Sequence, residues 1–498
     1  MSIALPPPEV PVAVQPAQLP RGAFQTKRRF GAYGLYFHGF DSIDDDEIDQ
    51  LIAKSTNAEL LIVGLENLVY TQGHLTSRLV YSLSGKNLYV AMINRKIRSI
   101  RAPADLAAFF SGIVSQQEFN VSQFERLRVL ASAYCDRTKQ DVRMRFVDAP
   151  GNMVDLEMRT EPQENTSPIS VEAEVSNYGS RFAGRNLVGI TLGIDPLRGY
   201  EAALQAKTSP QQFNSASTQG SYREEALNLS NVSAAGVVGL NLRRLDFSAT
   251  LPAPAVNGRY QEAGLEFSDV FFASLTHRGM YRLRVSYGDR YTENQLDGMT
   301  LFSEKFVIAE VTPSFATDFG KERLEVFAPL IAGHSVSALK SLADTRFQLA
   351  RPLIRGVWRQ SDHLSMTGFA IGQWTSNILP ESQQWTLGGE GTLSAFTPAA
   401  LIGDTGFLLR VNQAVRQPLS QGLEWSSELF SEYGLTHRNI VASNSSASEH
   451  AADVGLSLGL FWSRNAEISL KAAVPISRPQ HMSDTDRAFF YASIKLRL

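Results

Sequence analysis

The fold class is decided by the last ten residues of the chain, Phe489-Phe-Tyr-Ala-Ser-Ile-Lys-Leu-Arg-Leu498. Apolar residues alternate there with polar ones: Phe490, Ala492, Ile494, Leu496 and Leu498 against Tyr491, Ser493, Lys495 and Arg497. A period of two predicts a β-strand with one apolar and one wet face. An unpaired strand edge recruits other chains, whereas a closed barrel has no edge and can turn its apolar face to lipid. One such strand also fits a soluble sheet, so the decision depends on whether the pattern recurs.

The same alternation recurs through the second two-thirds of the chain. It covers residues 169–176, 281–288, 454–462 and 467–474, with a shorter run at 324–330. No helical pattern of comparable strength competes with these runs. About 330 residues, at roughly 20 per strand and connection, give about 16 strands, within the range of single-chain outer-membrane barrels. The sequence therefore predicts a mostly β protein with a C-terminal transmembrane antiparallel β-barrel.

Composition excludes several classes of function. The formal net charge of -3 gives no whole-chain case for nucleic-acid binding. No run of 18 apolar residues exists for a membrane helix, but barrel strands place only every second residue on lipid. The single Cys135 rules out an intramolecular disulfide and is expected to pack in a helix rather than act as a nucleophile.

The start of the printed sequence carries no recognisable secretory signal. Residues 1–8 have no positively charged segment and no long apolar core. For an outer-membrane protein, we expect that the signal has been removed or that the true start lies upstream.

The sequence of the N-terminal third predicts a tail followed by two small α/β units. Residues 1–29 contain six prolines and end in Lys27-Arg28-Arg29, which favours an extended, poorly packed linker. Residues 30–101 predict the order strand, helix, helix, strand, strand, with Asp44 and Glu47 as a helix-start pair and Gly73 ending the second helix. Residues 102–163 repeat the scheme in shorter form.

Two local signals support the second unit. Ser122-Gln-Phe-Glu125 has the spacing of a capping box at the start of a helix. Residues 142–146 and 154–158 alternate on either side of Ala149-Pro-Gly-Asn152, a turn suited to proline and glycine. The barrel is expected over residues 164–498.

This arrangement resembles the POTRA-plus-barrel plan of two-partner-secretion outer-membrane transporters, the TpsB group of hemolysin secretion/activation proteins. The hairpin at 147–151, followed by 169–175 and 177–184, is similar to the family's junction between second POTRA domain and barrel. The family's long extracellular loop and its flanks are matched by Gln373, Leu387-Gly388-Gly389 and Gly403-Asp404-Thr405-Gly406.

The resemblance implies a loop folded into the barrel lumen, and here the sequence departs from the family. The family's Val-Arg-Gly-Tyr/Phe signature corresponds to Leu393-Ser394-Ala395-Phe396, so its arginine and glycine are replaced. The family's arginine is thought to meet an aspartate in a Phe-x-Asp-x-Gly motif, which corresponds to Phe430-Ser-Glu432-Tyr-Gly434. A hydrogen bond between Ser394 and Glu432 is one replacement for that ion pair. The alternatives are Phe396 packing or a displaced arginine such as Arg410.

No catalytic set or metal-ligand spacing is present in the sequence. The eight histidines are scattered, and no Gly-x-Ser-x-Gly elbow occurs. Residues 388–391 are glycine-rich but do not lead from a strand into a helix as a phosphate loop does. We expect no enzyme activity, no cofactor and no metal.

The resemblance implies a monomeric transporter of one unfolded, hemolysin- or adhesin-like partner exoprotein. Its POTRA-like units would capture the partner in the periplasm through a strand edge within 79–93 or 142–158. The partner would then pass through the barrel in the outer-membrane lipid, with the loop around Phe396 occupying or vacating the lumen. The alternatives are a factor that inserts other barrels, which usually has more POTRA units, a passive porin, and a soluble β-sandwich binding protein.

Overall fold

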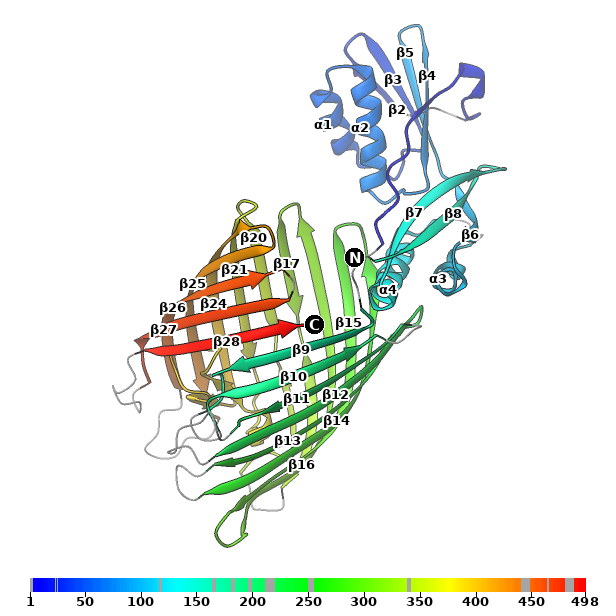
Figure 1. The fold of residues 1–498 in the computed structure, drawn as a ribbon. Coiled ribbons are helices and arrows are strands. Elements are labelled where there is room, and N and C mark those ends of the chain that lie inside the picture. The colour runs from blue at the N-terminus through cyan, green and yellow to red at the C-terminus, as the bar shows by residue number, and fades with distance from the viewer. Residues whose placement is uncertain are drawn as a thin grey trace. The chain divides into compact units, whose positions relative to one another are not determined.

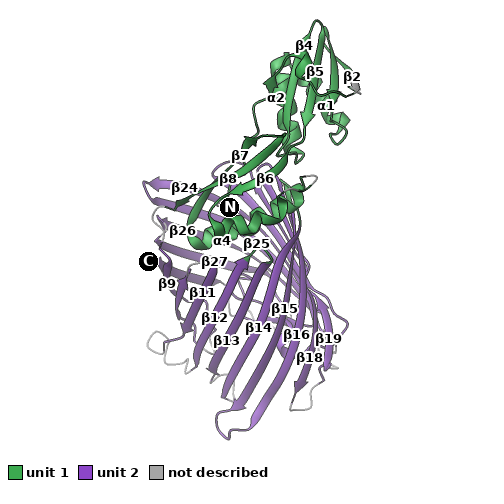
Figure 2. Cartoon of the chain, turned by 90° about the vertical axis from the view of Figure 1, so that its right-hand side faces the viewer, with its two compact units in different colours: residues 1–166, 233–235, 272–277 green, residues 167–232, 236–271, 278–498 purple. Residues whose placement is uncertain are grey.

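A computed structural model gives the structure of the chain. It describes residues 3–22, 24, 26–114, 116, 119–163, 167–180, 184–195, 199–210, 220–249, 255–337, 342–439, 448–463, 465–479 and 488–498. The chain forms two compact units, the first of residues 1–166, 233–235 and 272–277 and the second of residues 167–232, 236–271 and 278–498 (Figure 2). Helices and strands alternate in the first unit, whereas long strands dominate the second (Figure 1).

The strands of the second region close into an antiparallel barrel, which confirms the predicted fold class. They are β9 (Ile169–Ser176), β10 (Leu187–Ile194), β11 (Tyr200–Thr208), β12 (Ser221–Ser233), β13 (Gly236–Ala249), β14 (Val256–Ala273), β15 (His277–Asn294), β16 (Thr300–Phe319), β17 (Glu322–Phe327), β18 (Leu330–Ser337), β19 (Arg346–Ala350), β20 (Leu353–Arg359), β21 (Leu364–Gln373), β24 (Thr405–Ser420), β25 (Leu423–His437), β26 (Ser448–Trp462), β27 (Ala466–Ser477) and β28 (Phe489–Arg497). Closure comes from β28 pairing with β9, where Ile494 lies opposite Val175.

Two of the barrel strands are interrupted by prolines. Strands β17 and β18 flank Ala328-Pro329, and both pair with β16. Strands β19 and β20 flank Arg351-Pro352 in the same way, and β20 pairs with β17 while β19 pairs with β18. Proline has no N–H to give to a ladder, so each strand breaks there without leaving the wall. The 18 described segments therefore make 16 strands, as expected from the length.

The last strand shows how the two faces of the wall differ. Ile494 and Leu496 are 49% and 48% exposed, whereas Tyr491 and Ser493 on the opposite face are buried. Exposed apolar side chains recur on the same outer face of the other strands, for example Leu429 in β25 and Leu458 in β26. This alternation matches an apolar outside that faces lipid and a polar inside.

We predict that Ile494→Arg destabilises the barrel by roughly 2–4 kcal/mol if the site lies near the bilayer midplane, because a charge is then placed in hydrocarbon. Reversible unfolding in lipid vesicles, followed by tryptophan fluorescence, measures this cost. Lys495→Arg on the opposite face is the matched control and is expected to change little. A similar cost for both variants would show that the two faces are wrongly assigned.

The first α/β module of the first unit contains one five-stranded sheet with the order β1-β4-β5-β3-β2. Its elements are β1 (Val12–Ala13), η1 (Pro16–Gln18), β2 (Thr26–Phe30), β3 (Tyr33–His38), α1 (Asp45–Lys54), α2 (Ala58–Thr71), β4 (Arg78–Ser84) and β5 (Asn87–Ile93). The two helices pack on the sheet through buried Ile48, Leu61 and Leu65. Asp44 caps α1 by accepting a hydrogen bond from the Asp46 N–H, and Gly73 follows α2 with a φ of +96°.

The second module contains β6 (Lys96–Arg101), α3 (Ala104–Phe110), η2 (Ser111–Ile113), α4 (Val121–Thr138), β7 (Gln140–Ala149) and β8 (Met153–Pro162), with the sheet order β6-β8-β7. Strand β6 pairs with β8, so residues 96–101 belong to this second sheet although we expected them at the end of the first unit. The repeat is thus complete: strand, helix, helix, strand, strand. The domain boundaries stay a prediction. Among the described residues, none of the helices combines the length and apolar character of a membrane span.

Helix α4 differs from the sequence prediction at its start. The side chain of Asn120, not Ser122, caps the helix by accepting from the Gln123 N–H at 3.0 Å. Further along α4, Cys135 is fully buried, and burial raises the pKa of its thiol to about 12. A thiol that stays protonated is unreactive, in keeping with a packing role.

The N-terminal segment differs from the expected poorly packed tail. Ile3 is fully buried, and Val12 and Ala13 pair in parallel with Val80 and Tyr81 of β4. Within the expected linker, Arg28 lies in β2 and forms ion pairs with Asp45 and Asp49. Proline-rich segments are already extended and are tolerated at sheet edges, so this composition suits an edge strand as well as a linker.

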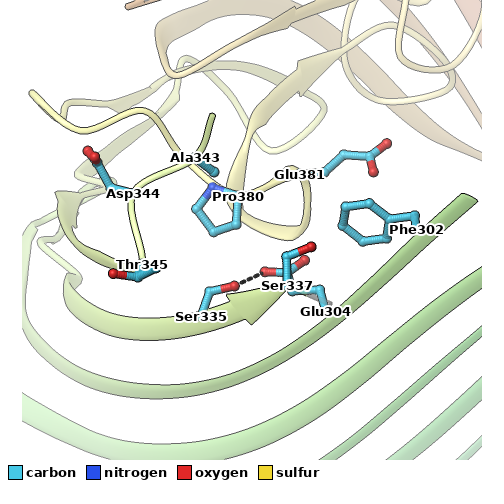
Figure 3. A pocket seen from close by; sticks show the side chains of 9 residues that line it. All are labelled: Phe302, Glu304, Ser335, Ser337, Ala343, Asp344, Thr345, Pro380 and Glu381. Atoms are coloured by element: carbon cyan, nitrogen blue, oxygen red, sulfur yellow. Dashed lines mark hydrogen bonds between the residues drawn. The ribbon is translucent and has the colours of Figure 1, made fainter. Parts of the chain in front are cut away.

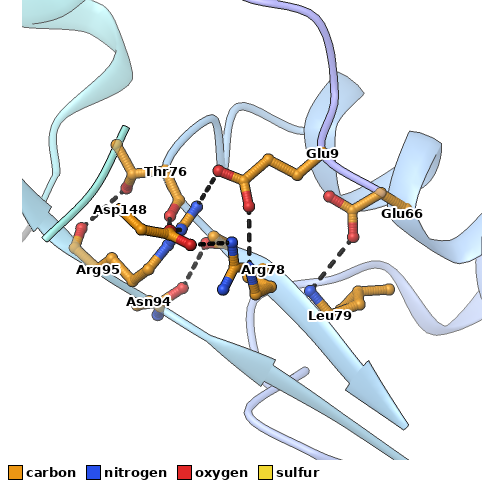
Figure 4. Close-up of polar contacts among 9 residues, drawn as sticks. Glu9, Glu66, Thr76, Arg78, Leu79, Asn94, Arg95 and Asp148 are labelled. Atoms are coloured by element: carbon orange, nitrogen blue, oxygen red, sulfur yellow. Dashed lines mark hydrogen bonds and ion pairs between the residues drawn. The ribbon is translucent and has the colours of Figure 1, made fainter. Parts of the chain in front are cut away.

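We predict a pH-dependent stability of the first unit that depends on Glu66 of α2. Glu66 is 4% exposed and accepts a hydrogen bond from the Leu79 N–H, and its burial raises its pKa from 4.5 to about 7 (Figure 4). The unfolded chain ionises near pH 4.5 and the folded one near pH 7, so stability is full below pH 4.5 and is lost as the pH rises through 7. The loss is at most about 3 kcal/mol.

Glu66→Gln removes this dependence while keeping the acceptor for Leu79. The measurement is hydrogen exchange of the β4 amides. Comparing the variant with the wild type at the same pH cancels the intrinsic effect of pH on the exchange rate. We expect equal protection at pH 4 and greater protection of the variant at pH 8. Equal protection at both pH values would contradict the assignment.

Candidate functional site

The segment between β21 and β24 forms a folded loop, residues 374–404. It contains η4 (Glu381–Gln383) and a short hairpin of β22 (Trp385–Leu387) and β23 (Leu401–Gly403). The hairpin tip begins at Gly388 and Gly389, whose φ values are +115° and +98°. A Cβ at Gly388 would lie 2.2 Å from the Thr397 carbonyl oxygen, so only glycine fits this turn. The glycine-rich sequence therefore gives a compact tip with a defined path.

The tip packs against the inner face of the barrel wall. In β25, Phe430, Glu432 and Gly434 are buried, whereas the residues that alternate with them, Leu429, Ser431 and Tyr433, are exposed. The predicted loop residues Leu393, Ala395 and Phe396 form a buried cluster with Leu387, Leu401, Leu408, Phe430, Ala451 and Ala473. The loop is thus held inside the barrel by apolar contacts, and Phe396 is one of several anchors.

Two buried carboxylates bind consecutive backbone amides of the tip. Glu432 Oε2 accepts a hydrogen bond from the Ser394 N–H at 2.7 Å, and Asp453 Oδ2 accepts one from the Ala395 N–H at 2.7 Å. Glu432 and Asp453 face each other across β25 and β26 and are both at most 1% exposed. This carboxylate pair fixes the tip to the wall.

The contact between Ser394 and Glu432 differs in kind from the expected side-chain bond. The Ser394 hydroxyl is buried and has no hydrogen-bond partner among the described residues. The side chains of Ser394 and Ala395 are too short to span a gap between the loop and the wall. Their small size lets the backbone N–H groups approach the carboxylates of Glu432 and Asp453 directly. The sequence correspondence placed Ser394 beside Glu432, but it gave no sign of the backbone donors or of Asp453.

Arg410 of β24 supplies a cation beside this pair, as one of the sequence alternatives proposed. It lies opposite Glu432 in the ladder, and its Nη1 is 3.4 Å from Glu432 Oε1. Its Nη2 forms a shorter ion pair of 2.7 Å with Glu428, and its guanidinium lies 4.8 Å from the centre of the Phe430 ring. One guanidinium therefore shares its charge between two carboxylates and a ring.

Gln373 and Asp404 hold the two ends of the loop together. Gln373 was predicted as a wall partner and is fully buried, and its Nε2 donates to the carbonyl oxygens of Asp404 at 2.7 Å and Gln383 at 3.1 Å. The Asp404 carboxylate accepts from the Leu379 and Asn439 N–H groups, both at 2.8 Å. At Gly403, a Cβ would meet the His437 carbonyl oxygen at 2.6 Å. These predicted residues shape the base of the loop and do not touch its tip.

Two further polar contacts, absent from the sequence prediction, attach the loop to separate parts of the wall. Glu390 at the tip forms an ion pair with Lys471 of β27. In η4, the Ser382 hydroxyl donates to Glu304 of β16 at 3.0 Å. In the strand order, β16 and β27 are far apart, so the loop spans the barrel interior. Charged residues on the inward face of the alternation, such as Glu304 and Lys471, were the available signal.

A cavity of about 100 Å³ lies beside the Glu304 attachment (Figure 3). It is lined by Phe302, Glu304, Ser335, Ser337, Ala343, Asp344, Thr345, Pro380 and Glu381. Glu304 is 1% exposed and accepts a hydrogen bond from the Ser335 hydroxyl at 2.7 Å. Among the described residues, no three His, Cys, Asp or Glu side chains gather as metal ligands, here or elsewhere.

Comparison with known proteins gives one family and a consistent fold. The family model for "Haemolysin secretion/activation protein ShlB/FhaC/HecB" matches residues 157–461. CdiB from Escherichia coli is similar with a TM-score of 0.74 and 17% identity, over 97% of this chain and 93% of that chain. CdiB from Acinetobacter baumannii is similar with a TM-score of 0.65 and 14% identity, over 91% and 86%. No match was found among the curated proteins.

We predict that removing both carboxylates, in the double variant Glu432→Ala with Asp453→Ala, frees the tip and raises the ion conductance of the reconstituted barrel. Each hydrogen bond to a loop amide contributes about 0.5–1.5 kcal/mol, so the loss of both weakens the attachment of the tip while the apolar packing remains. Glu428→Ala is the matched control, since Glu428 pairs with Arg410 and not with the loop. Unchanged conductance of the double variant in planar bilayers would show that this contact does not close the lumen.

Proposed function

Because the chain belongs to the haemolysin secretion/activation protein family ShlB/FhaC/HecB, we propose that it carries one partner exoprotein through its barrel to the cell surface. Family and fold together make it an outer-membrane β-barrel of two-partner secretion. The further steps of capture, passage and release are our proposal. The partner is a secreted chain that crosses unfolded and folds outside.

The observation that carries the proposal is the loop inside the barrel. It is attached by a few separable contacts: two amide–carboxylate bonds at Ser394 and Ala395, the Glu390–Lys471 ion pair, and the apolar cluster. None of these contacts belongs to the barrel ladder, so the loop can leave the wall while all ladder hydrogen bonds remain. A transporter needs this combination of a stable wall and a removable obstruction.

The two α/β modules are the proposed capture device on the periplasmic side. Each has the strand, helix, helix, strand, strand order, and each sheet ends in an edge strand whose backbone groups suit strand addition. A passive porin has no need for such modules. A barrel-assembly factor has the same plan, and it is the alternative that the experiment must separate.

The test is to lock the loop during secretion. We predict that Glu390→Cys with Lys471→Cys, joined by a short bis-methanethiosulfonate cross-linker that releases sulfinate as each disulfide forms, blocks surface appearance of the partner exoprotein. Reduction should restore secretion, because it frees the tip again. The measurement is protease accessibility of the exoprotein on cells that express both chains, and each single cysteine variant is a control.

Three outcomes would contradict the proposal. The exoprotein could stay in the periplasm although the wild-type barrel is folded, as shown by heat-dependent gel mobility. It could also be secreted equally with the loop locked, which would exclude passage beside the loop. A fall in the amounts of other outer-membrane barrels after deletion of the chain, with normal secretion, would favour the assembly factor.

A further inference from the structure

Residues 3–14, which we call the N-terminal strap, lie against the edge strands of both sheets in the first unit. Ile3 forms an isolated parallel bridge with Val142 of β7. Val12 and Ala13 form β1 on the edge of β4, and the Val14 N–H donates to the Tyr81 carbonyl at 2.8 Å. Without the strap, β4 and β7 would both be unpaired edges. These two strands overlap the ranges 79–93 and 142–158 that the sequence indicated for capture of the partner.

The strap is held between these ends by side chains from several elements. Arg128 of α4 donates to the Ile3 carbonyl at 2.7 Å, and Tyr70 of α2 donates to the Pro6 carbonyl at 2.6 Å. Every residue has a backbone carbonyl group, so these two contacts recognise an extended backbone and do not depend on a particular side chain. They form a receptacle for a peptide of many sequences.

One side chain of the strap is recognised by charge. The Glu9 carboxylate accepts from Arg78 Nε at 3.0 Å and forms an ion pair with Arg95 Nη2 at 2.5 Å (Figure 4). Both guanidinium groups also bind Asp148, which is 60% exposed, whereas the Arg95 side chain is 3% exposed. Without Glu9, two cations face one exposed carboxylate. Arg95 would keep its contacts with Asp148 and the Thr76 carbonyl but would lose one of its two carboxylates, so the empty site favours another carboxylate.

The strap makes poor use of the edges that it covers. It pairs with β4 over only two residues and with β7 at one bridge. Pro6, Pro7, Pro8 and Pro11 cannot donate backbone hydrogen bonds. Val10 is 82% exposed and adds little packing. A proline-free segment would form more ladder bonds with β4 and would fill the same receptacle better.

We propose that the groove occupied by the N-terminal strap is the docking site for an extended segment of the secreted partner, and that the strap is an internal competitor displaced by strand exchange. This rests on the proposed function. The partner segment carries a carboxylate where the strap has Glu9 and an apolar residue where the strap has the buried Ile3. Between them it has β-forming residues in place of proline.

This arrangement makes capture selective. A tethered strap has a high effective concentration, so weak ligands fail to displace it. A ligand that pairs along the whole β4 edge and supplies the carboxylate gains contacts that the strap lacks. The apparent dissociation constant of the partner equals its intrinsic dissociation constant divided by the fraction of chains whose groove is open.

The first test measures the receptacle with the strap itself as probe. A chain of residues 15–498, reconstituted in nanodiscs, is titrated with a fluorescent peptide of residues 3–14. We expect saturable binding that weakens at least tenfold when the peptide carries Glu9→Ala. A peptide with Val10→Ala is the matched control and should bind as the parent does. Absence of binding, or equal binding of the Glu9→Ala peptide, would overturn the proposal.

The second test asks whether the partner uses the same groove. The probe is the amino-terminal domain of the exoprotein that the chain is found to secrete. We expect severalfold tighter binding to the chain lacking residues 1–14, and to the full-length Glu9→Ala variant, with competition by the 3–14 peptide. The Glu9→Ala chain keeps its strap, so it serves if the truncated chain does not fold. Unchanged or weaker binding to both variants would show that the strap is only a structural tie.

The two proposals fail in different ways. If the chain secretes no exoprotein, the proposed function fails and this inference fails with it. If secretion is normal and blocked by the locked loop, but the peptide does not compete with the exoprotein domain, only the docking site is overturned.

Discussion

Everything else in the second unit depends on the pairing of β28 with β9. Backbone groups that face hydrocarbon find no water, so a sheet can cross a bilayer only if it has no edge. The closure is an antiparallel ladder that pairs residues 493–497 with residues 172–176, extended by hydrogen bonds in both directions between Val171 and Leu498 and by the ion pair of Glu172 with Arg497. It joins residues more than 300 positions apart. The interior then becomes a separate compartment, in which a loop can be held by contacts that play no part in the wall.

Inside that compartment, the tip of the loop is held by hydrogen bonds from its backbone amides to side-chain carboxylates of the wall. Where the resemblance implied a loop arginine paired with a wall aspartate, this chain has wall carboxylates that accept hydrogen bonds from loop amides. The donors at Ser394 and Ala395 are fixed by the backbone and lose little conformational freedom on binding, unlike a long arginine side chain. The cation has moved to the wall, where Arg410 lies beside Glu432. Loop and wall therefore need no complementary charges at the sequence positions where the family has them.

The sequence predicted those parts of the structure that lipid and local geometry control. A lipid-facing wall forces a period of two, so the barrel could be read from strands such as 454–462. The helix start at Asp44 and the turn at Gly73 follow from local hydrogen bonds and φ values. The role of Asp453 and the Glu390–Lys471 pair could not be predicted, because they depend on which residues face each other across strands. The alternation of apolar and polar residues shows which face a residue lies on, but not its partner on the neighbouring strand. The N-terminal strap was missed because its few apolar residues are widely spaced and bind separate sheets.

The proline interruptions in the wall have a mechanical consequence. Pro313 in β16, Pro329 and Pro352 lie on three successive strands, and their carbonyls accept from the Ala328, Arg351 and Gly372 N–H groups at 2.9–3.0 Å. None of the three prolines has a backbone N–H to donate, so each of these strands lacks one cross-strand hydrogen bond. The missing bonds lie on neighbouring strands. Bending stiffness across a sheet comes from its rungs. Along this line the wall therefore resists bending less than it does where the ladder between two strands is complete.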